Sequence, residues 1–409
     1  MTLRAASLRL PSRAILCLVM TGASLLLGET KRVPVTLRVA NQAMERWPDG
    51  RIGPKGTPAA WGFELGIVLA GMSAVWSATR EPAYFYYLQH TIDNFVQPDG
   101  AIAAYDMRAY SLNNILIGRE LLVLYGATHQ EKYRRAAETL RQQIATQPRT
   151  ASGGLWHSKS TPNLMLLDDQ FMVAPFYAEY AATLHEPQDL DDLVRQFTLL
   201  EQHTYDPVTG LMYHGWDESR TMPWANKNTG ASPSLWARGM GWYLMALVDS
   251  LPYLSERDPH RARLLAILHR ACAAVAQAQD PQSGLWYQIL DKPGAKDNYI
   301  ESSSVLMFTY AFAKAARLGY LPGRYAAIAT RAWQAIGTRF VLSPPSGQVE
   351  IAGTVSHVAL GATAQDDGTY AYYLHAPVVN NDPKGVGAFL LAGSEMELRG
   401  SQSHPRRHP

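Results

Sequence analysis

The stretch Pro162–Tyr180, PNLMLLDDQFMVAPFYAEY, indicates a buried helix that begins with two acids, and the rest of the chain is interpreted from it. Its apolar side chains recur at the spacing of a buried helix, so we expect a core helix over residues 165–182. Two adjacent acids, Asp168 and Asp169, open this helix, and Pro175 is expected to interrupt it. An aspartate at a helix N-terminus is usually a cap, so only further observations can assign either acid a chemical role. The apolar positions are Met165, Leu167, Phe171, Met172, Phe176 and Tyr180.

Helical periodicity recurs throughout the chain, and the helices come in pairs. We predict them over residues 35–46, 60–79, 81–95, 110–126, 130–146, 166–184, 188–204, 236–253, 259–279, 300–318, 322–341 and 385–399. One glycine with an apolar residue one or two positions later recurs per pair, at Gly50, Gly100, Gly154, Gly210, Gly284 and Gly347. Successive glycines lie 50, 54, 56, 74 and 63 residues apart, enough for two helices of about 16 residues with their loops. Each glycine is expected to supply a turn with positive φ.

Six such hairpins predict an all-α fold, an (α/α)6 toroid formed by a single domain over residues 29–409. An open array of helical repeats is the alternative, but the irregular intervals are unlike a solenoid's fixed period. The two longest intervals place extra chain at residues 214–235 and 342–384. Because long loops at one end of a scaffold commonly carry function, we expect them to contribute to a site.

Composition and charge exclude some functions and suggest an export route. The 409 residues carry a formal net charge of +2 without a basic block, so no nucleic-acid partner is expected. Arginines precede the apolar run at residues 14–27, which is typical of a signal peptide over residues 1–28 and too short to span a bilayer comfortably. An uncleaved anchor remains the alternative. Removal of the signal would leave Cys272 as the one thiol, and the protein would be periplasmic or secreted, with no stable membrane association.

Polar and aromatic residues cluster in or beside the predicted turns. Indole faces stack on sugar rings, and a guanidinium pairs with a carboxylate through two hydrogen bonds, so the cluster favours a site for an acidic sugar. Each residue also has a structural alternative: the histidines could bond loop backbone, the tryptophans could be core, and Arg238 could pair with Asp217. No zinc-like cluster, phosphate-binding loop or nucleophile elbow is present, so neither metal nor cofactor is expected. The cluster comprises Asn113, His157, His214, Trp236, Arg238 and Trp242.

Several blocks of the sequence, taken together, resemble glycoside hydrolase family 105, the unsaturated rhamnogalacturonyl hydrolases, which are related to the family 88 unsaturated glucuronyl hydrolases. The resemblance covers about residues 35–399. It implies an (α/α)6 barrel and an oligosaccharide substrate whose terminal uronic acid, expected to be galacturonate on a rhamnogalacturonan fragment, carries the C4=C5 double bond left by a lyase. The blocks are LNNILIGRELL, PRTASGGLWHSKSTPNLMLLDDQFMVAPFYAEYA, DPVTGLMYHGWDESR, SLWARGMGWYLMALVDSL, DPQSGLWYQILDKP and NDPKGVGAFLLA.

The resemblance also implies a role for Asp168, which matches the family's acid: it would protonate C4 and assist the addition of water at C5. The resulting hemiketal would open and expel the aglycone. By motif position, the six clustered polar and aromatic residues would line the pocket. The chain departs from the family pattern at four positions, with Asn113 for an aspartate, Leu166 for a tryptophan, Asp169 for a glycine and Ser158 for a lysine.

These departures leave three questions open. Asp169 could stand in for the missing acid, although successive helical residues point about 100° apart. A hydrolase of saturated glycosides on the same fold would need Asp217 or Glu218 as a partner acid. A carbohydrate-binding relative that has lost catalysis is the third reading.

Overall fold

The computed structural model describes residues 33–53, 56–345, 347–361 and 363–399, and the toroid belongs to the unit that begins at Pro34. The predicted signal peptide lies outside the described residues.

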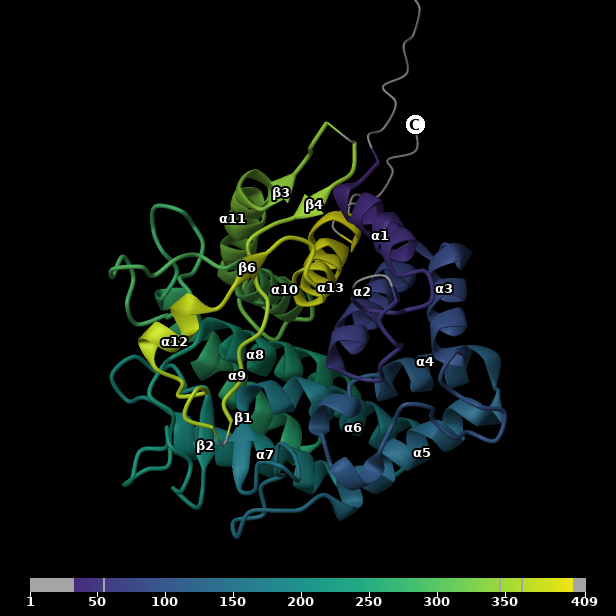
Figure 1. Ribbon diagram of the computed structural model, residues 1–409, viewed down its shortest axis with the longest axis horizontal. Helices are drawn as coiled ribbons and strands as arrows, with labels where there is room; N and C mark the ends of the chain where they lie inside the picture. The colour runs from purple at the N-terminus through teal and green to yellow at the C-terminus, as the bar shows by residue number, and fades with distance from the viewer. Residues whose placement is uncertain (1–32, 54–55, 346, 362, 400–409) are drawn as a thin grey trace, which may run out of the picture. The chain divides into compact units, whose positions relative to one another are not determined.

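Six helices form an inner ring. Each packs against the next one along the chain, and the last of them packs against the first, so the ring is closed (Figure 1). These helices are largely buried, and α8 is buried along all 14 of its residues, so its sequence is mostly apolar and its charged residues, Arg238 and Asp249, lie near its two ends. They are α2 (Phe63–Thr79), α4 (Gly118–Thr128), α6 (Leu167–Thr183), α8 (Ala237–Ser250), α10 (Ser302–Arg317) and α13 (Pro383–Gly393).

A second set of helices packs outside the inner ring. Each pairs with one inner helix: α3 with α2, α5 with α4, α7 with α6, α9 with α8, α11 with α10 and α1 with α13. These outer helices bury one face only, as the spacing of Tyr133, Ala137, Leu140 and Ile144 along α5 shows. The (α/α)6 toroid predicted from the hairpin pattern is confirmed. The outer helices are α1 (Val35–Arg46), α3 (Pro82–Asp93), α5 (Glu131–Thr146), α7 (Asp189–Thr204), α9 (Pro259–Gln277) and α11 (Arg324–Arg339).

The glycine turns follow the outer helices and return the chain to the start of an inner helix. Gly50, Gly100, Gly210, Gly284 and Gly347 all have positive φ, as predicted. At the third turn the prediction was displaced by one residue, because Gly153 rather than Gly154 has positive φ. Bridges such as Val96 to Ile102 and Tyr205 to Met212 close these turns, whereas the inner-to-outer connections are mostly short. The longer connections, and the side chains they carry, therefore gather where the inner helices begin.

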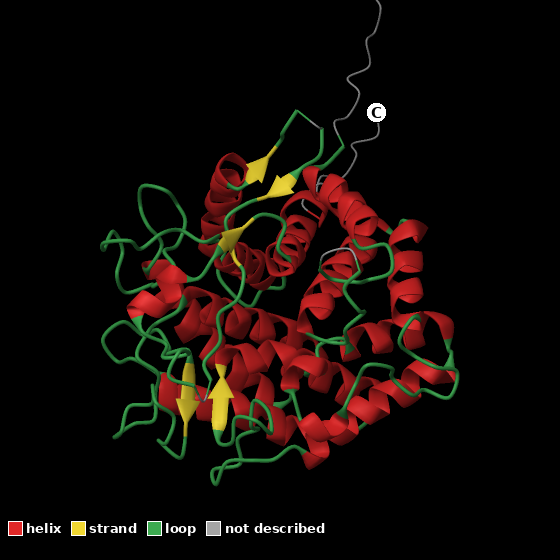
Figure 2. Cartoon of the chain, in the orientation of Figure 1, coloured by secondary structure: helices red, strands yellow, loops and turns green. Residues whose placement is uncertain are grey.

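Short strands and one short helix lie in the loops, where helical periodicity gives no signal (Figure 2). Strand β1 pairs with β2, β3 with β4 and β5 with β6, all antiparallel. Helix α12 lies in the long loop that precedes α13. The bounds are β1 (Leu164–Leu166), β2 (Gly215–Asp217), β3 (Val341–Leu342), β4 (Glu350–Ile351), β5 (Thr354–Val355), β6 (Val378–Val379) and α12 (Tyr370–His375).

Two local predictions around the opening stretch were wrong. Met165 is extended rather than helical, because residues 164–166 pair with β2 and α6 begins only at Leu167. Pro175 does not interrupt α6, which continues to Thr183. A proline inside a helix costs about 3 kcal/mol, which the burial of both flanks of α6 offsets.

The fourth helix begins later than predicted. Two 3-10 turns, η1 (Met107–Ala109) and η2 (Leu112–Asn114), occupy the segment expected to be helical, and α4 starts at Gly118. Asn113 therefore lies in a 3-10 turn before the helix rather than on its first turn. The chain has another 3-10 turn, η3 (Leu251–Tyr253), and a π-helical segment, η4 (Ser394–Arg399). Within the described ranges, no helix has the length and apolar character needed to cross a membrane.

Candidate active site

A pocket of about 560 Å³ lies at the end of the toroid where inner helices begin. Its lining comes from the starts of α2, α6, α8 and α13, from the turn before α4, and from the loop before α12. The structure brings together all seven residues singled out from the sequence, although they are spread over about 130 positions. They are Asn113, His157, Asp168, His214, Trp236, Arg238 and Trp242.

Asp168 lies in the first turn of α6, where it is one-fifth exposed to the pocket. Its Oδ2 is 2.9 Å from Nε2 of His214, and Nδ1 of His214 is 2.7 Å from the hydroxyl of Tyr373. The structure gives Oδ1 of Asp168 no hydrogen-bond partner among the described residues. Asp168 is also the one carboxylic acid among the described residues that line this pocket. One of its oxygens is therefore held in place while the other remains available to a bound molecule.

Tyr373, on α12, was not found from the sequence. Its side chain is fully buried, stacks on Trp236 with ring centroids 5.1 Å apart, and contacts His214. Burial, reinforced by the charge of Asp168, raises the pKa of Tyr373 well above its usual value, so the phenol keeps its proton. It can therefore donate to Nδ1 of His214, which leaves an Nε2–H to donate to Asp168. Its distance in sequence from His214 explains why no local pattern indicated this contact.

Asp169 has a different function from its neighbour. Its Oδ2 accepts a hydrogen bond from the backbone N–H of Leu166 at 2.9 Å, and its Oδ1 is 2.7 Å from Nδ1 of His157. Burial lowers the pKa of His157, but the charge and hydrogen bond of Asp169 outweigh that effect, with a smaller contribution from Asp168, so the pKa is raised. Asp169 is only 3% exposed, and both of its oxygens are engaged. The idea that it replaces the missing acid therefore has no geometric support.

The two tryptophans form the wall of the pocket. Trp236 lies directly before α8 and packs against His214 and Tyr373, whereas Trp242 packs against Phe171 of α6. Each tryptophan is only 1% exposed. Each tryptophan therefore lines the pocket, as predicted, and is also part of the buried core, as in the structural alternative. Nε1 of Trp236 is buried and has no hydrogen-bond partner among the described residues.

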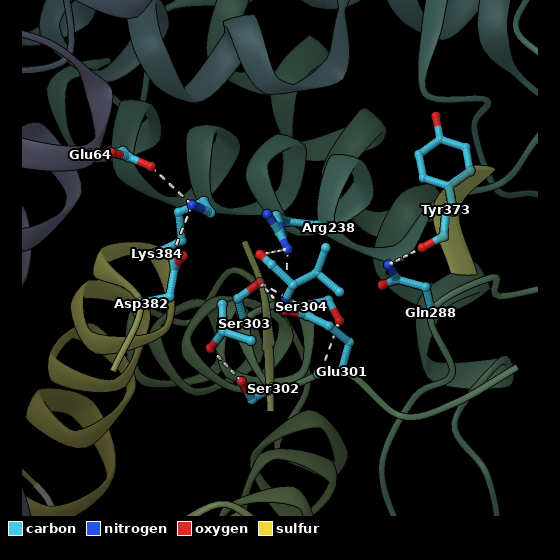
Figure 3. A network of polar contacts seen from close by, with 12 residues as sticks. Glu64, Arg238, Gln288, Glu301, Ser302, Ser303, Ser304, Tyr373, Asp382 and Lys384 are labelled. Carbon is cyan, nitrogen blue, oxygen red and sulfur yellow. Dashed lines mark hydrogen bonds and ion pairs between the residues drawn. The ribbon is translucent and has the colours of Figure 1, made fainter. Parts of the chain in front are cut away.

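Arg238 is buried in the first turn of α8, and its partner is not Asp217. Its Nη2 donates to Glu301 at 3.3 Å and to the carbonyl of Val355 at 2.5 Å, as Figure 3 shows for this network. Glu301 is fully buried and also caps α10 through the N–H of Ser304. Nε of Arg238 is buried without a partner among the described residues. Nη2 of the guanidinium is thus anchored to the protein by two hydrogen bonds, which fixes the position of the pocket-lining side chain.

Lys384 is a second cation in the pocket wall that was not singled out from the sequence. It lies in the first turn of α13 with its side chain only 4% exposed. Its Nζ is 2.9 Å from Asp382 and 3.1 Å from Glu64 (Figure 3). The block NDPKGVGAFLLA contains it, but nothing in the local sequence indicates that α13 begins beside α2.

Comparison with known proteins identifies the family. The family profile described as Glycosyl Hydrolase Family 88 matches residues 35–399. A solved family 105 glycoside hydrolase from C. acetobutylicum superposes with a TM-score of 0.83 and 36% identity, over 88% of this chain and 98% of that chain. This chain belongs to glycoside hydrolase family 105, which is related to family 88. It is a hydrolase of the type that acts on unsaturated uronyl glycosides.

Two curated proteins also resemble this family 105 enzyme. Protein Atu3128 of Agrobacterium fabrum is 42% identical over 234 residues, which make up 56% of this chain and 99% of that protein. The unsaturated rhamnogalacturonyl hydrolase YesR of Bacillus subtilis is 28% identical over 251 residues, 60% of this chain and 68% of that protein.

The long loops of this family 105 enzyme contribute to the site as predicted for residues 342–384. Ser356, His357, Val358 and Ala359 line the pocket from that loop, and α12 within it carries Tyr373. These residues lie in a segment without regular periodicity, so only the length of the loop indicated its importance. In the loop at residues 214–235, His214 lines the pocket, and Trp224 belongs to the same buried apolar cluster as the pocket-lining Leu166.

The acids required for a hydrolase of saturated glycosides lie elsewhere. Asp217 is fully buried and accepts hydrogen bonds from Ser219 and from the backbone N–H of Met222. Glu218 holds the turn at residues 151–152 instead. Neither lines the pocket of this family 105 enzyme. Within the described part of the chain, no group of three or more histidine, cysteine or acidic residues is placed to hold a metal ion.

Proposed function

We propose that this enzyme releases C4=C5-unsaturated galacturonic acid from the non-reducing end of rhamnogalacturonan fragments produced by a lyase. The observation that carries the proposal is Asp168, with Oδ2 fixed by His214 and Oδ1 directed to no protein group among the described residues, in a pocket that also holds Arg238 and Lys384. Cations beside a single acid suit a substrate that carries a carboxylate and needs a proton. YesR, a relative named for rhamnogalacturonyl substrates, supports the choice of aglycone.

The chemistry follows from an acid that both gives and accepts a proton. Asp168 donates its proton to C4, and water adds to C5 and returns a proton to the Asp168 carboxylate. The product at C5 is a hemiketal, which opens to a ketone. The hydroxyl thereby freed at C1 makes that carbon a hemiacetal, which expels the aglycone alcohol and leaves an aldehyde. Because the anomeric carbon is not attacked, a second carboxylate at the spacing used by ordinary glycosidases is not required.

The test follows the ultraviolet absorbance of the conjugated double bond with lyase-generated oligosaccharides from rhamnogalacturonan, ulvan and glycosaminoglycans. We expect the highest kcat/KM for the rhamnogalacturonan fragments and a loss of about 10³-fold or more in Asp168→Asn, in line with removal of a general acid. A higher kcat/KM with another polysaccharide would overturn the substrate assignment. Undiminished activity of Asp168→Asn, or no turnover of any unsaturated substrate, would overturn the proposed function.

We infer in addition that the enzyme acts outside the cytoplasm of a bacterium, as a periplasmic or secreted protein that degrades pectin. The arginines and the apolar run within residues 1–28 support this. Determination of the mature N-terminus by mass spectrometry after expression from the full-length gene tests it. A mature protein that retains residue 1 would contradict signal removal.

A further inference from the structure

The toroid is also hollow at the end where its inner helices finish. A cavity of about 1370 Å³ lies there, larger than the 560 Å³ pocket that holds Asp168, and we call it the far-end hollow. Its walls come mostly from the later turns of α2, α4, α6, α10 and α13 and from the segments η3 and η4. The proposed reaction uses none of the residues that line it.

Asp249, near the end of α8, is the first of two acids that each hold two cations at this end. Its side chain is fully buried, with Oδ2 2.8 Å from Nη1 of Arg119 and Oδ1 2.6 Å from Nζ of Lys314. Burial raises the pKa of Asp249, but the charges of Lys314 and Arg119 outweigh that effect, so the pKa is lowered and the acid stays charged. Glu179 lies 4.0 Å from Nε of Arg119 and offsets part of the remaining positive charge.

Glu395, in η4, is the second such acid. It accepts hydrogen bonds from Nε and Nη2 of Arg317, at 2.5 and 2.8 Å, and its Oε1 is also 3.5 Å from Nε of Arg399. Lys314 and Arg317 lie three positions apart on α10 and therefore share a face of that helix. The two acid-centred groups are thus neighbours, and together they place four cations around one hollow.

The acids at this end do not balance the cations. Burial raises the pKa of Glu120 to about 8, so this lining residue is uncharged at neutral pH. At most three carboxylates, those of Asp249, Glu179 and Glu395, then carry charge beside the five cations that line the hollow. The partial negative charge at helix C-termini favours cations here, but it leaves their hydrogen-bond donors unused. The five cations are Arg80, Arg119, Lys314, Arg317 and Arg399.

Three of these cations have N–H donors that the fold does not use. The structure gives Nη2 of Arg119 and Nη1 of Arg317 no hydrogen-bond partner among the described residues. Lys314 uses two of its three donors, for Asp249 and for the hydroxyl of Tyr310 at 3.0 Å. The side chain of Arg317 is 40% exposed, and those of Arg119 and Lys314 are 15% and 14% exposed, so solvent in the hollow reaches all three.

We propose that the far-end hollow binds a small anion, a molecule no larger than a disaccharide that carries carboxylate or phosphate oxygens. Its charged group accepts hydrogen bonds from the unused donors of Arg119, Lys314 and Arg317, since guanidinium and ammonium groups recognise both kinds of oxygen. A hollow of this volume accommodates a ligand of that size. The site is separate from the pocket at Asp168, and the inference does not rest on the proposed function.

The experiment measures binding of galacturonate and of inorganic phosphate to the full chain by calorimetry at low ionic strength, with galactose as the neutral counterpart of galacturonate. We expect at least one of the two anions to bind with a Kd of about 1 mM or lower, and galactose to bind at least about tenfold more weakly than that anion. Tighter binding of galacturonate would identify an acidic sugar as the type of ligand, and tighter binding of phosphate would identify a phosphate ester.

Ala127 allows the charge of the hollow to be changed without breaking an ion pair. It is exposed, lies in the last turn of α4 and lines the hollow. Ala127→Glu should weaken anion binding about threefold to tenfold, and Ala127→Lys should strengthen it by a similar factor, because each adds one charge near the bound anion. Ala273→Glu is the matched control: it adds the same charge at an exposed position of α9 outside the hollow and should leave the Kd unchanged.

Arg317→Gln removes one of the proposed donors directly, while Arg399 remains beside Glu395. This variant should bind the anion about tenfold more weakly or worse, as expected for the loss of a charge-assisted hydrogen bond. If it does not fold, the two Ala127 variants decide alone.

Three results would overturn the inference: no binding of either anion up to about 10 mM, equal affinity for galactose and galacturonate, or a Kd that the Ala127 substitutions do not change. None of them bears on the proposed function, because Ala127 lies at the other end of the toroid from Asp168. Turnover of the unsaturated substrate should therefore be the same in both Ala127 variants as in the wild type.

Discussion

Replacement of Tyr373 by phenylalanine removes one hydroxyl group that reaches the pocket only through His214 and Asp168. The hydroxyl lies 2.7 Å from Nδ1 of His214, which is itself 1% exposed, so water has no access to replace it. A buried nitrogen left without a partner costs about 1–3 kcal/mol. Because 1.36 kcal/mol corresponds to a factor of ten in rate, a loss of this size in the transition state would lower kcat about 5- to 150-fold.

The assay is the decrease of double-bond absorbance under saturating substrate. We expect kcat of Tyr373→Phe to fall within that range while KM changes less than about threefold, because the hydroxyl acts through the orientation of His214 rather than on the substrate. Tyr370→Phe is the matched control: it removes a hydroxyl from the same helix, whose bond goes to the carbonyl of Lys296 at 2.5 Å. A wild-type kcat in Tyr373→Phe, or an equal loss in the control, would refute the proposed role of this contact.

Three further variants probe a glycine turn and two buried titratable groups. Gly100→Ala should lower the free energy of unfolding by about 1–3 kcal/mol in urea titrations, because φ is +92° and the new Cβ would lie 2.5 Å from Cβ of Arg135. Gly347→Ala is the control, since φ is +79° there but the space around the new Cβ is open, and it should lower the free energy of unfolding by less. Equal losses in the two variants would show that the contact with Arg135 is irrelevant. Asp169→Asn removes the partner that raises the pKa of His157. The stabilisation from this pairing is fully present below about pH 6.5 and is lost as pH rises through the raised pKa of His157, so the urea midpoint of the variant should fall furthest below that of the wild type near pH 6. A difference in urea midpoint that does not change with pH would contradict the pairing. Burial raises the pKa of Glu120 from 4.5 to about 8, so the native state binds the extra proton and stability falls as pH rises through that interval. Glu120→Gln should therefore gain on the order of 4 kcal/mol over the wild type near pH 8 and little near pH 4.5. The reverse order would exclude a neutral buried acid.

The helices and turns of the toroid were predictable because their signals are local. A half-buried helix must place apolar residues at the spacing seen in α5, and a turn with positive φ favours glycine at positions such as Gly100. Short apolar runs carry less information, since Leu164–Leu166 suits a strand as well as a helix, and its pairing with β2 decides between them. The six residues of α12 are too few to show a helical period.

The pocket residues were predictable as a group, but their partners were not. Motifs beside the turns indicated His214 and Arg238, whereas their contacts with Tyr373 and Glu301 join segments 159 and 63 residues apart. For Arg238, the charged candidate nearer in sequence, Asp217, was the wrong partner. Side chains meet in the pocket because the toroid gathers the starts of its inner helices at one end, and local sequence does not encode which helix start faces which.

The two adjacent aspartates in the opening stretch show why that geometry matters. Acids at helix starts are expected to cap, and Asp169, Glu301 and Asp382 each direct an oxygen to a backbone N–H at the beginning of an inner helix. Asp168 makes no such bond among the described residues, since Asp169 already serves the start of α6 and orients His157 as well. A carboxylate engaged in a cap is held as an acceptor and is poorly suited to give up and regain a proton. The capping function of Asp169 therefore leaves Asp168 free for the proton transfer that we propose.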